Sequence, residues 1–334
     1  MPEENVSITS AEMGEMWGAY MNASLMTHVL SYFEEKVEDG DIREVVREAL
    51  DIMKSHKQQF TDLFEKENMP VPYGFTDEDL NASAPRLFSD NYFLQNIMQL
   101  GSLGMKSYSM GISYSTRQDI YSFFSEGFQD FNKLHQKTVM TGLSKGLISK
   151  PPIIPKRKER DFVKKQNFLT GWFGKRRPLL SVEIANLYSN IKRNVLGAAT
   201  ITGFAQVAQS KEVKDYFIRG VEIAQKHAEI FNSILNENNI PAPTGSDTMV
   251  TAEAEVSPFS DKLMMYHTTG MITLGIGFYG LSISSNIRRD IATHYVRLTE
   301  EIMLYSEDGA NIMIDNGWLE EPPRMVDRDE LAKG

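Results

Sequence analysis

Apolar residues recur three to five positions apart along most of the first 145 residues, in blocks separated by short polar breaks. In the first block they are Met13, Met16, Trp17, Tyr20, Leu25 and Val29. This spacing places apolar side chains on one face of an α-helix. The breaks divide the segment into four predicted helices, at about 10–38, 41–68, 89–114 and 116–145. No segment is predicted to be a strand, so the expected fold class is all-α.

Residues that cap or interrupt helices set the predicted ends. Ser10 is the expected N-cap of the first helix. Pro70 and Pro72 prevent the second helix from continuing. Gly146 suits the left-handed conformation that ends many helices, and Pro151-Pro152 follows it. The fourth helix is therefore expected to end at about residue 145.

The same pattern occurs a second time. A shift of 171 residues places Asn68-x-Pro70-x-Pro72-x-Gly74 on Asn239-x-Pro241-x-Pro243-x-Gly245. The alignment needs no gap between residues 8–152 and 179–323, and 25 of its 145 positions are identical. Average composition alone would give roughly 6% identity. We therefore predict two tandem domains of the same fold, residues 8–152 and 179–323.

Connection lengths indicate how the four helices of each domain are arranged. Tight breaks join the first helix to the second and the third to the fourth, so each pair should be antiparallel. The second and third helices are joined by residues 69–88, a segment long enough to run the length of a helix. The predicted fold is therefore two tandem four-helix bundles, each ferritin-like with one long crossover between helices 2 and 3.

Charge is distributed unevenly along the chain. There are 35 Lys and Arg residues against 45 Asp and Glu residues, a net charge of −10. Residues 150–178 hold ten basic and two acidic residues, a net charge of +8, so the rest of the chain carries −18. An acidic chain does not favour nucleic acid as a general partner.

The basic segment also carries four aromatic residues, Phe162, Phe168, Trp172 and Phe173. We therefore expect residues 153–178 to form a linker that docks on the bundles and buries these rings. The alternative is an exposed strap that binds nucleic acid, a phosphorylated surface or an acidic polymer.

Some features narrow the class of protein. The chain has no Cys, which excludes disulfides, thiolate metal sites and Cys nucleophiles. The N-terminus lacks the basic and apolar regions of a signal peptide. Residues 263–287 carry no charged residue, but His267, Asn286 and several Ser and Thr favour a buried helix over a membrane span. We expect a cytoplasmic protein that does not enter a membrane.

A ferritin-like bundle suggests a di-metal site, which needs a Glu from each of two helices and Glu-x-x-His from each of the other two. The chain retains two candidate ligands in each domain, His56 with Asp130 and His227 with Glu301. Neither histidine has a Glu three positions before it. On helices about 40 Å long, the two members of each pair lie at the same height.

Two protein ligands do not hold a metal tightly. We therefore predict buried His–carboxylate pairs with raised His pKa values, and neither a cofactor nor a bound metal. A remnant metal site or small-ligand site at His56, Asp130, His227 and Glu301 is the alternative.

A second set of charged residues lies near the predicted helix ends. Glu12 and Arg117 should meet at one end of the first bundle, and Glu183 and Arg288 repeat this arrangement in the second. We expect structural ion pairs that fix the register of the helices.

Four segments resemble a known family. They are Asp161-Phe-Val-Lys-Lys-Gln-Asn-Phe168, Gly203-Phe-Ala-Gln-Val-Ala208, Pro258-Phe-Ser-Asp-Lys-Leu-Met-Met265, and Asp308-Gly-Ala-Asn-Ile-Met-Ile314 with the following Gly317-Trp-Leu-Glu-Glu-Pro-Pro323. They are similar to a family of spore-forming bacteria catalogued as domain of unknown function 3231, some of whose members are labelled putative spore coat proteins. The resemblance extends over essentially the whole chain. It implies a tandem ferritin-like bundle without an established activity, and it supplies no catalytic residues.

We therefore interpret the chain as a non-catalytic structural or interaction protein connected with sporulation or the spore coat. It would act through protein partners or self-association, in the cytoplasm, the forespore or the spore coat. The alternative is a ferritin-like carrier or oxidoreductase that uses the mid-bundle histidines and carboxylates with a metal or a small ligand.

Overall fold

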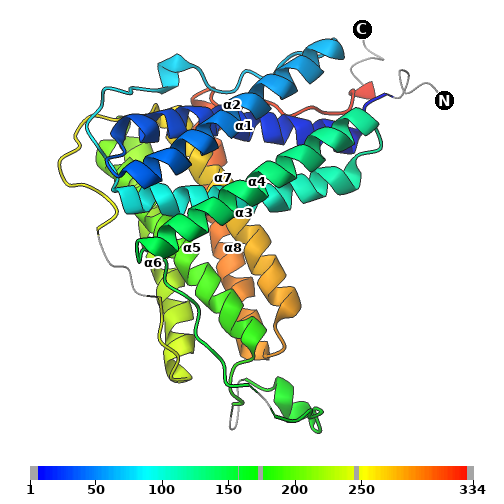
Figure 1. Cartoon of the computed structure of the whole chain (residues 1–334), viewed down its shortest axis with the longest axis vertical. Coiled ribbons are helices and arrows are strands. Elements are labelled where there is room, and N and C mark those ends of the chain that lie inside the picture. The colour runs from blue at the N-terminus through cyan, green and yellow to red at the C-terminus, as the bar shows by residue number, and fades with distance from the viewer. Residues whose placement is uncertain (1–6, 157, 172–175, 244–247, 329–334) are drawn as a thin grey trace. The chain divides into compact units, whose positions relative to one another are not determined.

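The computed structural model describes residues 7–156, 158–171, 176–243 and 248–328 (Figure 1). Over these residues the chain forms eight α-helices and two short 3₁₀ helices, and no strand. The α-helices are α1 (Ser10–Lys36), α2 (Gly40–Lys66), α3 (Asp90–Tyr114), α4 (Gln118–Ser144), α5 (Ser181–Val207), α6 (Lys211–Glu237), α7 (Asp261–Ser285) and α8 (Arg289–Asp315). The predicted all-α fold class is confirmed.

The repeat found in the sequence extends to the helix boundaries. Each helix of α5–α8 begins and ends 171 residues after its counterpart in α1–α4. For example, α1 begins at Ser10 and α5 at Ser181, while α4 ends at Ser144 and α8 at Asp315. The chain is therefore built from two sets of four helices of matching length.

Local hydrogen bonds explain the helix ends. The N-cap of α1 is Thr9 and not Ser10, because Thr9 exchanges hydrogen bonds with Glu12 three residues later. The Thr9 hydroxyl accepts from the Glu12 amide, and the Glu12 carboxylate accepts from the Thr9 amide. After α4, Gly146 has a φ of 68°, the left-handed conformation expected from the sequence.

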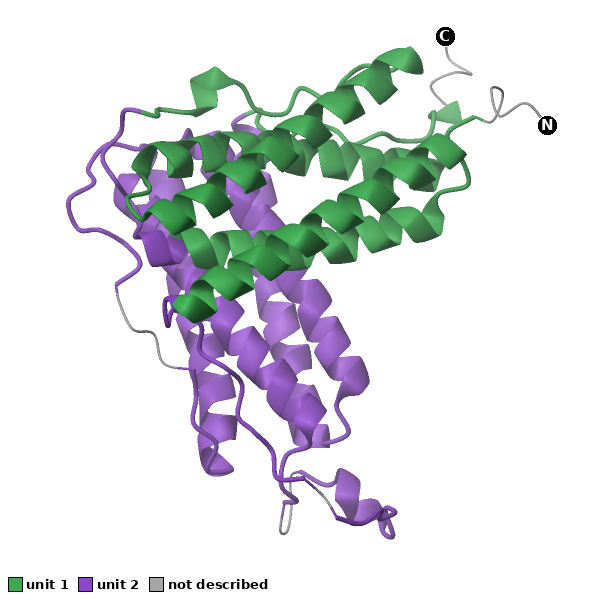
Figure 2. Ribbon diagram, viewed as in Figure 1, with its two compact units in different colours: residues 1–82, 93–144, 317–334 green, residues 83–92, 145–316 purple. Residues whose placement is uncertain are grey.

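The helices form two compact units (Figure 2). Over the described residues, unit 1 contains residues 7–82, 93–144 and 317–328, and unit 2 contains residues 83–92 and 145–316. Each unit therefore includes a short segment from outside its own repeat. The predicted boundaries, 8–152 and 179–323, still describe the sequence repeat.

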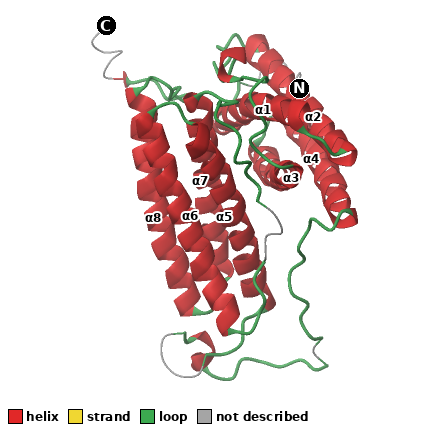
Figure 3. Ribbon diagram, turned by 90° about the vertical axis from the view of Figure 1, so that its left-hand side faces the viewer, coloured by secondary structure: helices red, strands yellow, loops and turns green. Residues whose placement is uncertain are grey.

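In unit 2 each of the four long helices packs against two others (Figure 3). Helix α5 contacts α6 and α7, and α8 contacts α6 and α7. Helices α6 and α8, the second and fourth of the repeat, are therefore neighbours, as the connection lengths indicate. The core between them is lined by aromatic and aliphatic side chains, including Phe217, Phe231, Tyr295 and Leu298. The ferritin-like crossover stays a prediction.

The segment at residues 83–92 is held in unit 2 by backbone pairing and aromatic packing. Its Leu87 carbonyl accepts from the Thr251 amide at 2.9 Å. The buried ring of Phe88 lies over Gly203 of α5, where a Cβ atom would come within 2.5 Å of the ring. Farther along, the hydroxyls of Tyr92 and Thr200 are 2.9 Å apart. Gly203 thus allows the segment to lie directly against α5.

In unit 1, α2 packs against α1 and α4. The rings of Phe33 and Phe93 stack with their centroids 4.4 Å apart. Residues that follow α8 complete this unit: the Glu320 carboxylate accepts from the amides of Tyr73 and Gly74, at 2.9 and 3.2 Å. The loop between α2 and α3 is therefore fixed by the last described segment of the chain.

The linker between the repeats differs in part from the expected buried segment. Phe162 is 85% exposed and lies in a stretch, residues 158–167, that is exposed throughout and packs on neither bundle core. Phe168 is half-buried beneath the guanidinium of Arg177, which lies 4.4 Å from the ring centroid. Trp172 and Phe173 lie outside the described residues. Burial of Phe162 was therefore wrongly predicted, and docking of the linker as a whole stays a proposal.

Candidate functional site

A buried histidine lies at the centre of unit 2. His227, in the middle of α6, has its Nε2 atom 3.0 Å from Oε2 of Glu301 on α8. Its Nδ1 atom lies 3.0 Å from the hydroxyl of Tyr279 on α7. An ionised carboxylate only accepts hydrogen bonds, so Nε2 of the neutral ring donates to Glu301 and the Tyr279 hydroxyl donates to Nδ1. We call Tyr279, His227 and Glu301 the unit 2 triad.

Unit 1 contains the equivalent residues. Nδ1 of His56 lies 2.9 Å from the Tyr108 hydroxyl, and Nε2 lies 3.5 Å from Oδ2 of Asp130. These three residues form the unit 1 triad. The structure thus brings together both His–carboxylate pairs considered from the sequence. The tyrosines were missed, although Tyr108 and Tyr279 are matched by the same 171-residue shift as the histidines.

Burial decides the ionisation of the two histidines. Removal from water lowers the pKa of both imidazoles, and the hydrogen-bonded carboxylates only partly offset this effect. The expected rise in pKa is therefore wrong. The rings of His56 and His227 are buried, whereas Asp130 and Glu301 are 42% and 31% exposed, so water screens the carboxylates. Both histidines are neutral near pH 7.

Aromatic rings fill the space around the unit 1 triad. Phe123 and Phe131 meet the imidazole of His56 edge-on, with centroids 5.7 and 5.5 Å away. Gly104 faces Phe131 closely, since a Cβ atom at Gly104 would lie 2.3 Å from that ring. The small residue in α3 therefore makes room for a phenylalanine and does not leave space for a ligand.

The donor set does not fit a di-metal centre. Both oxygens of Glu301 are engaged, one by His227 and the other by the ammonium of Lys226. Both nitrogens of His227 are engaged as well. Among the described residues, no three His, Asp or Glu side chains are grouped so that they could share an ion. A metal could bind here only by displacing existing hydrogen bonds, so we derive no chemistry through one.

Unit 2 extends its triad into a longer polar network. Asn194 donates to the hydroxyl of Tyr279 at 2.9 Å. One turn earlier on α5, Asn190 donates to the hydroxyls of Ser282 and Tyr295, at 2.9 and 3.2 Å. With His227 of the triad on α6, all four helices of the bundle are therefore joined through side-chain hydrogen bonds in its core.

A partly buried arginine ends this network. Arg193 donates to the side-chain oxygen of Asn190 at 3.1 Å, and its guanidinium lies 3.4 Å from the ring centroid of Phe278. Burial lowers the pKa of Arg193 to about 10. The repeat positions of Asn190 and Asn194 in unit 1 are Ala19 and Ala23, so the network belongs to unit 2 alone.

Glu12 meets Arg117 differently from the ion pair expected. The Glu12 carboxylate accepts from the backbone amides of Thr116 and Arg117, at 2.7 and 2.9 Å. The guanidinium of Arg117 is turned to Glu67 and Asp119, at 2.7 and 2.6 Å. The amides that precede α4 have no partner within the helix, and the carboxylate satisfies them. Although burial acts to raise it, these amide hydrogen bonds hold the pKa of Glu12 at about 2.

The predicted pair of Glu183 and Arg288 needs the same correction. Glu183 accepts from the Arg288 amide at 3.3 Å, while the Arg288 guanidinium pairs with Asp290 at 2.6 Å. The side chain that pairs with Glu183 is Arg177 of the linker, which makes two contacts of 2.7 and 2.8 Å. The end of the linker is thus bound to the start of α5.

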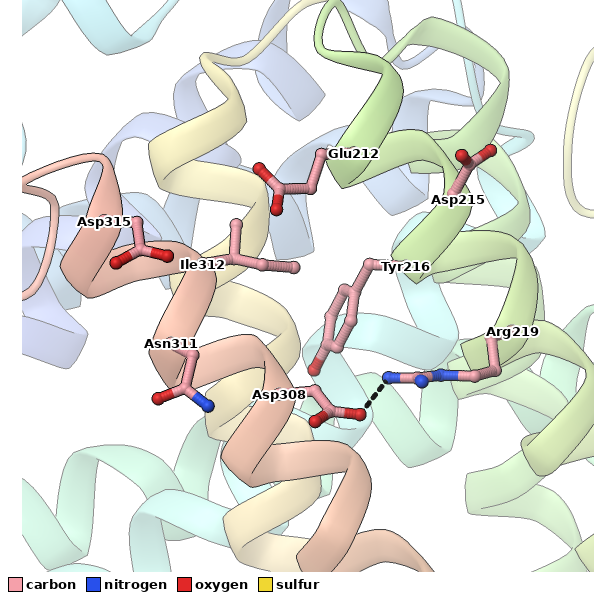
Figure 4. Close-up of a pocket in the computed structure, with 8 residues that line it drawn as sticks. All are labelled: Glu212, Asp215, Tyr216, Arg219, Asp308, Asn311, Ile312 and Asp315. Carbon is pink, nitrogen blue, oxygen red and sulfur yellow. Dashed lines mark hydrogen bonds and ion pairs between the residues drawn. The ribbon is translucent and has the colours of Figure 1, made fainter.

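A groove lies between the first turns of α6 and the last turns of α8 in unit 2 (Figure 4). Its volume is about 440 Å³. Four carboxylates and one guanidinium line it, and Arg219 pairs with Asp308 at 2.6 Å. We call it the acidic groove; its lining residues are Glu212, Asp215, Tyr216, Arg219, Asp308, Asn311, Ile312 and Asp315.

Tyr216, which lines this groove, stacks on Tyr305. The rings of Tyr216 and Tyr305 are 4.2 Å apart and nearly parallel, and each hydroxyl donates to the other's backbone carbonyl. Gly220 and Gly309 face the two hydroxyls. The matching residues of unit 1 share none of these features; they are Val45, Ala49, Leu134 and Thr138. The tyrosine stack is therefore a feature of the second repeat.

Comparison with known proteins identifies the family. The family model described as Protein of unknown function (DUF3231) matches residues 1–159 and again residues 167–331. The chain belongs to this family. Both copies of the DUF3231 match follow the tandem repeat.

One solved structure is similar to part of this DUF3231 chain. It is a putative spore coat protein from Bacillus halodurans, with 19% sequence identity and a TM-score of 0.42, and the match covers 46% of this chain and 99% of that one. No curated protein sequence matches the chain. In the described part of the chain, no helix combines the length and apolar character needed to span a membrane.

Proposed function

We propose that this DUF3231 protein is a non-catalytic structural or interaction protein. The supporting observation is that protein side chains already engage both ring nitrogens of each triad histidine, with Tyr108 and Asp130 around His56 and Tyr279 and Glu301 around His227. In the unit 2 triad, both nitrogens of His227 and both oxygens of Glu301 have protein partners. Such a site stabilises the bundle and offers no open position to a substrate or metal.

Sporulation is the proposed setting, and the forespore or spore coat the proposed location. This part of the proposal rests on the family resemblance. The protein would act there by binding other proteins or further copies of itself. In the native host, antibodies to the protein should detect it in extracts of purified spore coats. Detection in growing cells alone would contradict the proposed setting.

Elemental analysis tests the non-catalytic role against the alternative of a ferritin-like carrier or oxidoreductase. The protein is purified from cells supplied with iron, manganese and zinc, and its metal content is measured before and after dialysis. We expect well under one equivalent of each metal per chain. Two equivalents per chain that disappear in His227→Gln and His56→Gln variants would overturn the proposal.

A further inference from the structure

The linker exposes an unusual combination of side chains. We call the described residues 153–156 and 158–165 the basic strap. Ile153 is 97% exposed, Phe162 85% and Val163 62%. Exposed basic residues alternate with them, at Lys156, Lys158, Arg160, Lys164 and Lys165. Apolar side chains this exposed beside clustered positive charge are typical of a segment that binds an acidic surface with an apolar component.

The acidic groove offers the complementary chemistry. Glu212, Asp215 and Asp315 are exposed at its edge, and its single cation, Arg219, is neutralised by Asp308. Tyr216 and Ile312 are buried and supply an apolar floor. The tyrosine stack holds this floor in one arrangement, so little order has to be created on binding.

The strap and the groove lie at opposite ends of unit 2. Residues before and after the strap are held near the start of α5: the Tyr188 hydroxyl donates to the Lys150 carbonyl at 3.1 Å, and Arg177 binds Glu183. The groove lies beside the start of α6, which follows the end of α5. From Tyr188 to the end of α5 is ~28 Å along the helix. In Figure 1 the strap can be followed by its green colour before α5, and the start of α6 by its yellow-green colour after α5.

We propose that the basic strap of one molecule binds in the acidic groove of a second copy of this chain. Complementary charge is the main argument, because the sequence from 153 to 165 holds six basic and two acidic residues, a net charge of +4, whereas four carboxylates and one guanidinium line the groove. The two surfaces differ and lie at opposite ends of unit 2. The contact is therefore head-to-tail, and it can be repeated to add further molecules.

The groove is specific to the second repeat. In unit 1 the positions of Arg219 and Asp308 hold Glu48 and Lys137, which form the same ion pair with the charges exchanged, at 2.7 Å. Valine stands there in place of Tyr216. Unit 1 therefore provides a matched control surface. The inference deepens the proposed function, on which it rests, by naming the partner as a second copy.

Charge reversal tests the contact on the full-length protein. The strap variant is Lys158→Glu with Arg160→Glu, and the groove variant is Glu212→Lys with Asp215→Lys. The control, Asp41→Lys with Glu44→Lys, makes the same change at the matching positions of unit 1. Molecular mass is measured by sedimentation over a range of protein concentrations, at about 50 mM and about 500 mM salt. Circular dichroism verifies that each variant is folded.

We expect the mass of the wild-type protein and the control to rise with concentration at low salt, and to fall toward the monomer mass at high salt. Each reversal should raise the concentration of half-association by at least about tenfold. A mixture of the strap and groove variants should associate again, because positions 158–161 of the strap variant are then all acidic and meet the two lysines introduced in the groove variant.

Three results would overturn the inference. The first is a wild-type protein that is monomeric at every concentration and salt level. If trypsin does not cleave the strap of such a monomer, the strap binds within its own molecule, which also overturns the inference. The second is association that survives either reversal. The third is failure of the mixture to associate. None of these affects the metal content, so failure of this inference is distinguishable from failure of the proposed function.

Discussion

A Cβ atom at Gly309 would lie 2.3 Å from the hydroxyl oxygen of Tyr216. The opposite pair is similar, since a Cβ atom at Gly220 would lie 2.2 Å from the hydroxyl oxygen of Tyr305. Helices α6 and α8 thus each provide one tyrosine and one glycine to the stack. Glycine is tolerated in these helix interiors because the tyrosine rings occupy the space that a larger residue would need.

Replacing Gly220 with alanine tests this packing. Alanine favours a helix over glycine by about 1 kcal/mol, but overpacking against the Tyr305 hydroxyl costs about 1–3 kcal/mol. We expect a net decrease of the free energy of unfolding, measured by urea denaturation. A double variant, Gly220→Ala with Tyr305→Leu, has the same residues as repeat 1, where Ala49 and Leu134 stand at these positions. It should recover part of the lost free energy of unfolding.

Gly280 provides the control for that prediction. It lies on the exposed face of α7, and a Cβ atom there would meet nothing within 4 Å. Gly280→Ala should therefore raise the free energy of unfolding by up to about 1 kcal/mol. Equal stabilisation by Gly220→Ala and Gly280→Ala would contradict a tightly packed tyrosine stack.

The triads predict one tautomer for both buried histidines. Because Asp130 and Glu301 accept hydrogen bonds, His56 and His227 should be neutral at pH 7 with the proton on Nε2. Two-bond ¹⁵N–¹H NMR spectra distinguish this form from the Nδ1 tautomer and from imidazolium. Tyr279→Phe should leave the tautomer unchanged and lower the free energy of unfolding by about 1–2 kcal/mol. An imidazolium signal at pH 7 would show that the carboxylates outweigh burial.

Arg177 should be important for the stability of unit 2, since Glu183 is buried beside it. Arg177→Met leaves that carboxylate without its cation, and we expect a loss of roughly 3 kcal/mol at pH 7. The pKa of Glu183 is lowered in the folded protein, so the loss should shrink as pH falls below about 4 and the carboxyl group is protonated. Hydrogen exchange in α5 measures the effect.

The exposed pair of Lys164 and Asp161 supplies the comparison for Arg177. Their side chains are 3.2 Å apart in the same linker, and both are largely in water. Lys164→Met should change the stability by less than about 0.5 kcal/mol. A similar small effect for Arg177→Met would mean that the end of the linker is not bound to α5.

His267 should make the protein sensitive to acid. It is buried against Phe204, its Nδ1 atom has no hydrogen-bond partner, and burial lowers its pKa to about 4. Below about pH 6.5 the unfolded chain binds more protons at this histidine than the folded protein does. The free energy of unfolding should therefore be constant with respect to His267 above about pH 6.5 and fall by up to roughly 3 kcal/mol as pH falls toward 4. Asn96 is the residue of repeat 1 that matches His267. His267→Asn should therefore reduce the dependence of the free energy of unfolding on pH, measured by urea titrations at several pH values.

His56 and His227 add to the same acid sensitivity, because their pKa values are lowered too. The sequence led to the opposite expectation, with stability lost as pH rises. Residue spacing identified both partners of each pair correctly. It could not show that Asp130 and Glu301 remain in contact with water while the imidazoles do not, and that difference determines the sign.

The sequence predicts the helices well, the contacts at the bundle ends only in part, and the location of residues 83–92 not at all. The helices could be predicted because caps such as Gly146 and breaks such as Pro70 act locally. Glu12 and Glu183 were placed correctly at the bundle ends, but sequence does not show whether a carboxylate meets a guanidinium or a backbone amide. The location of residues 83–92 in unit 2 could not be predicted, because Phe88 aligns with Phe259 and thus has the same local pattern in both repeats.

The exchange of segments between the units has a consequence for synthesis on the ribosome. The chain passes from one unit to the other four times, at residues 82, 92, 144 and 316. Unit 1 contains both the first described residues and the last, with Glu320 holding Tyr73 and Gly74. The first unit to emerge is therefore the last to be completed, and a nascent chain that ends after α4 still lacks the segment that holds the loop between α2 and α3.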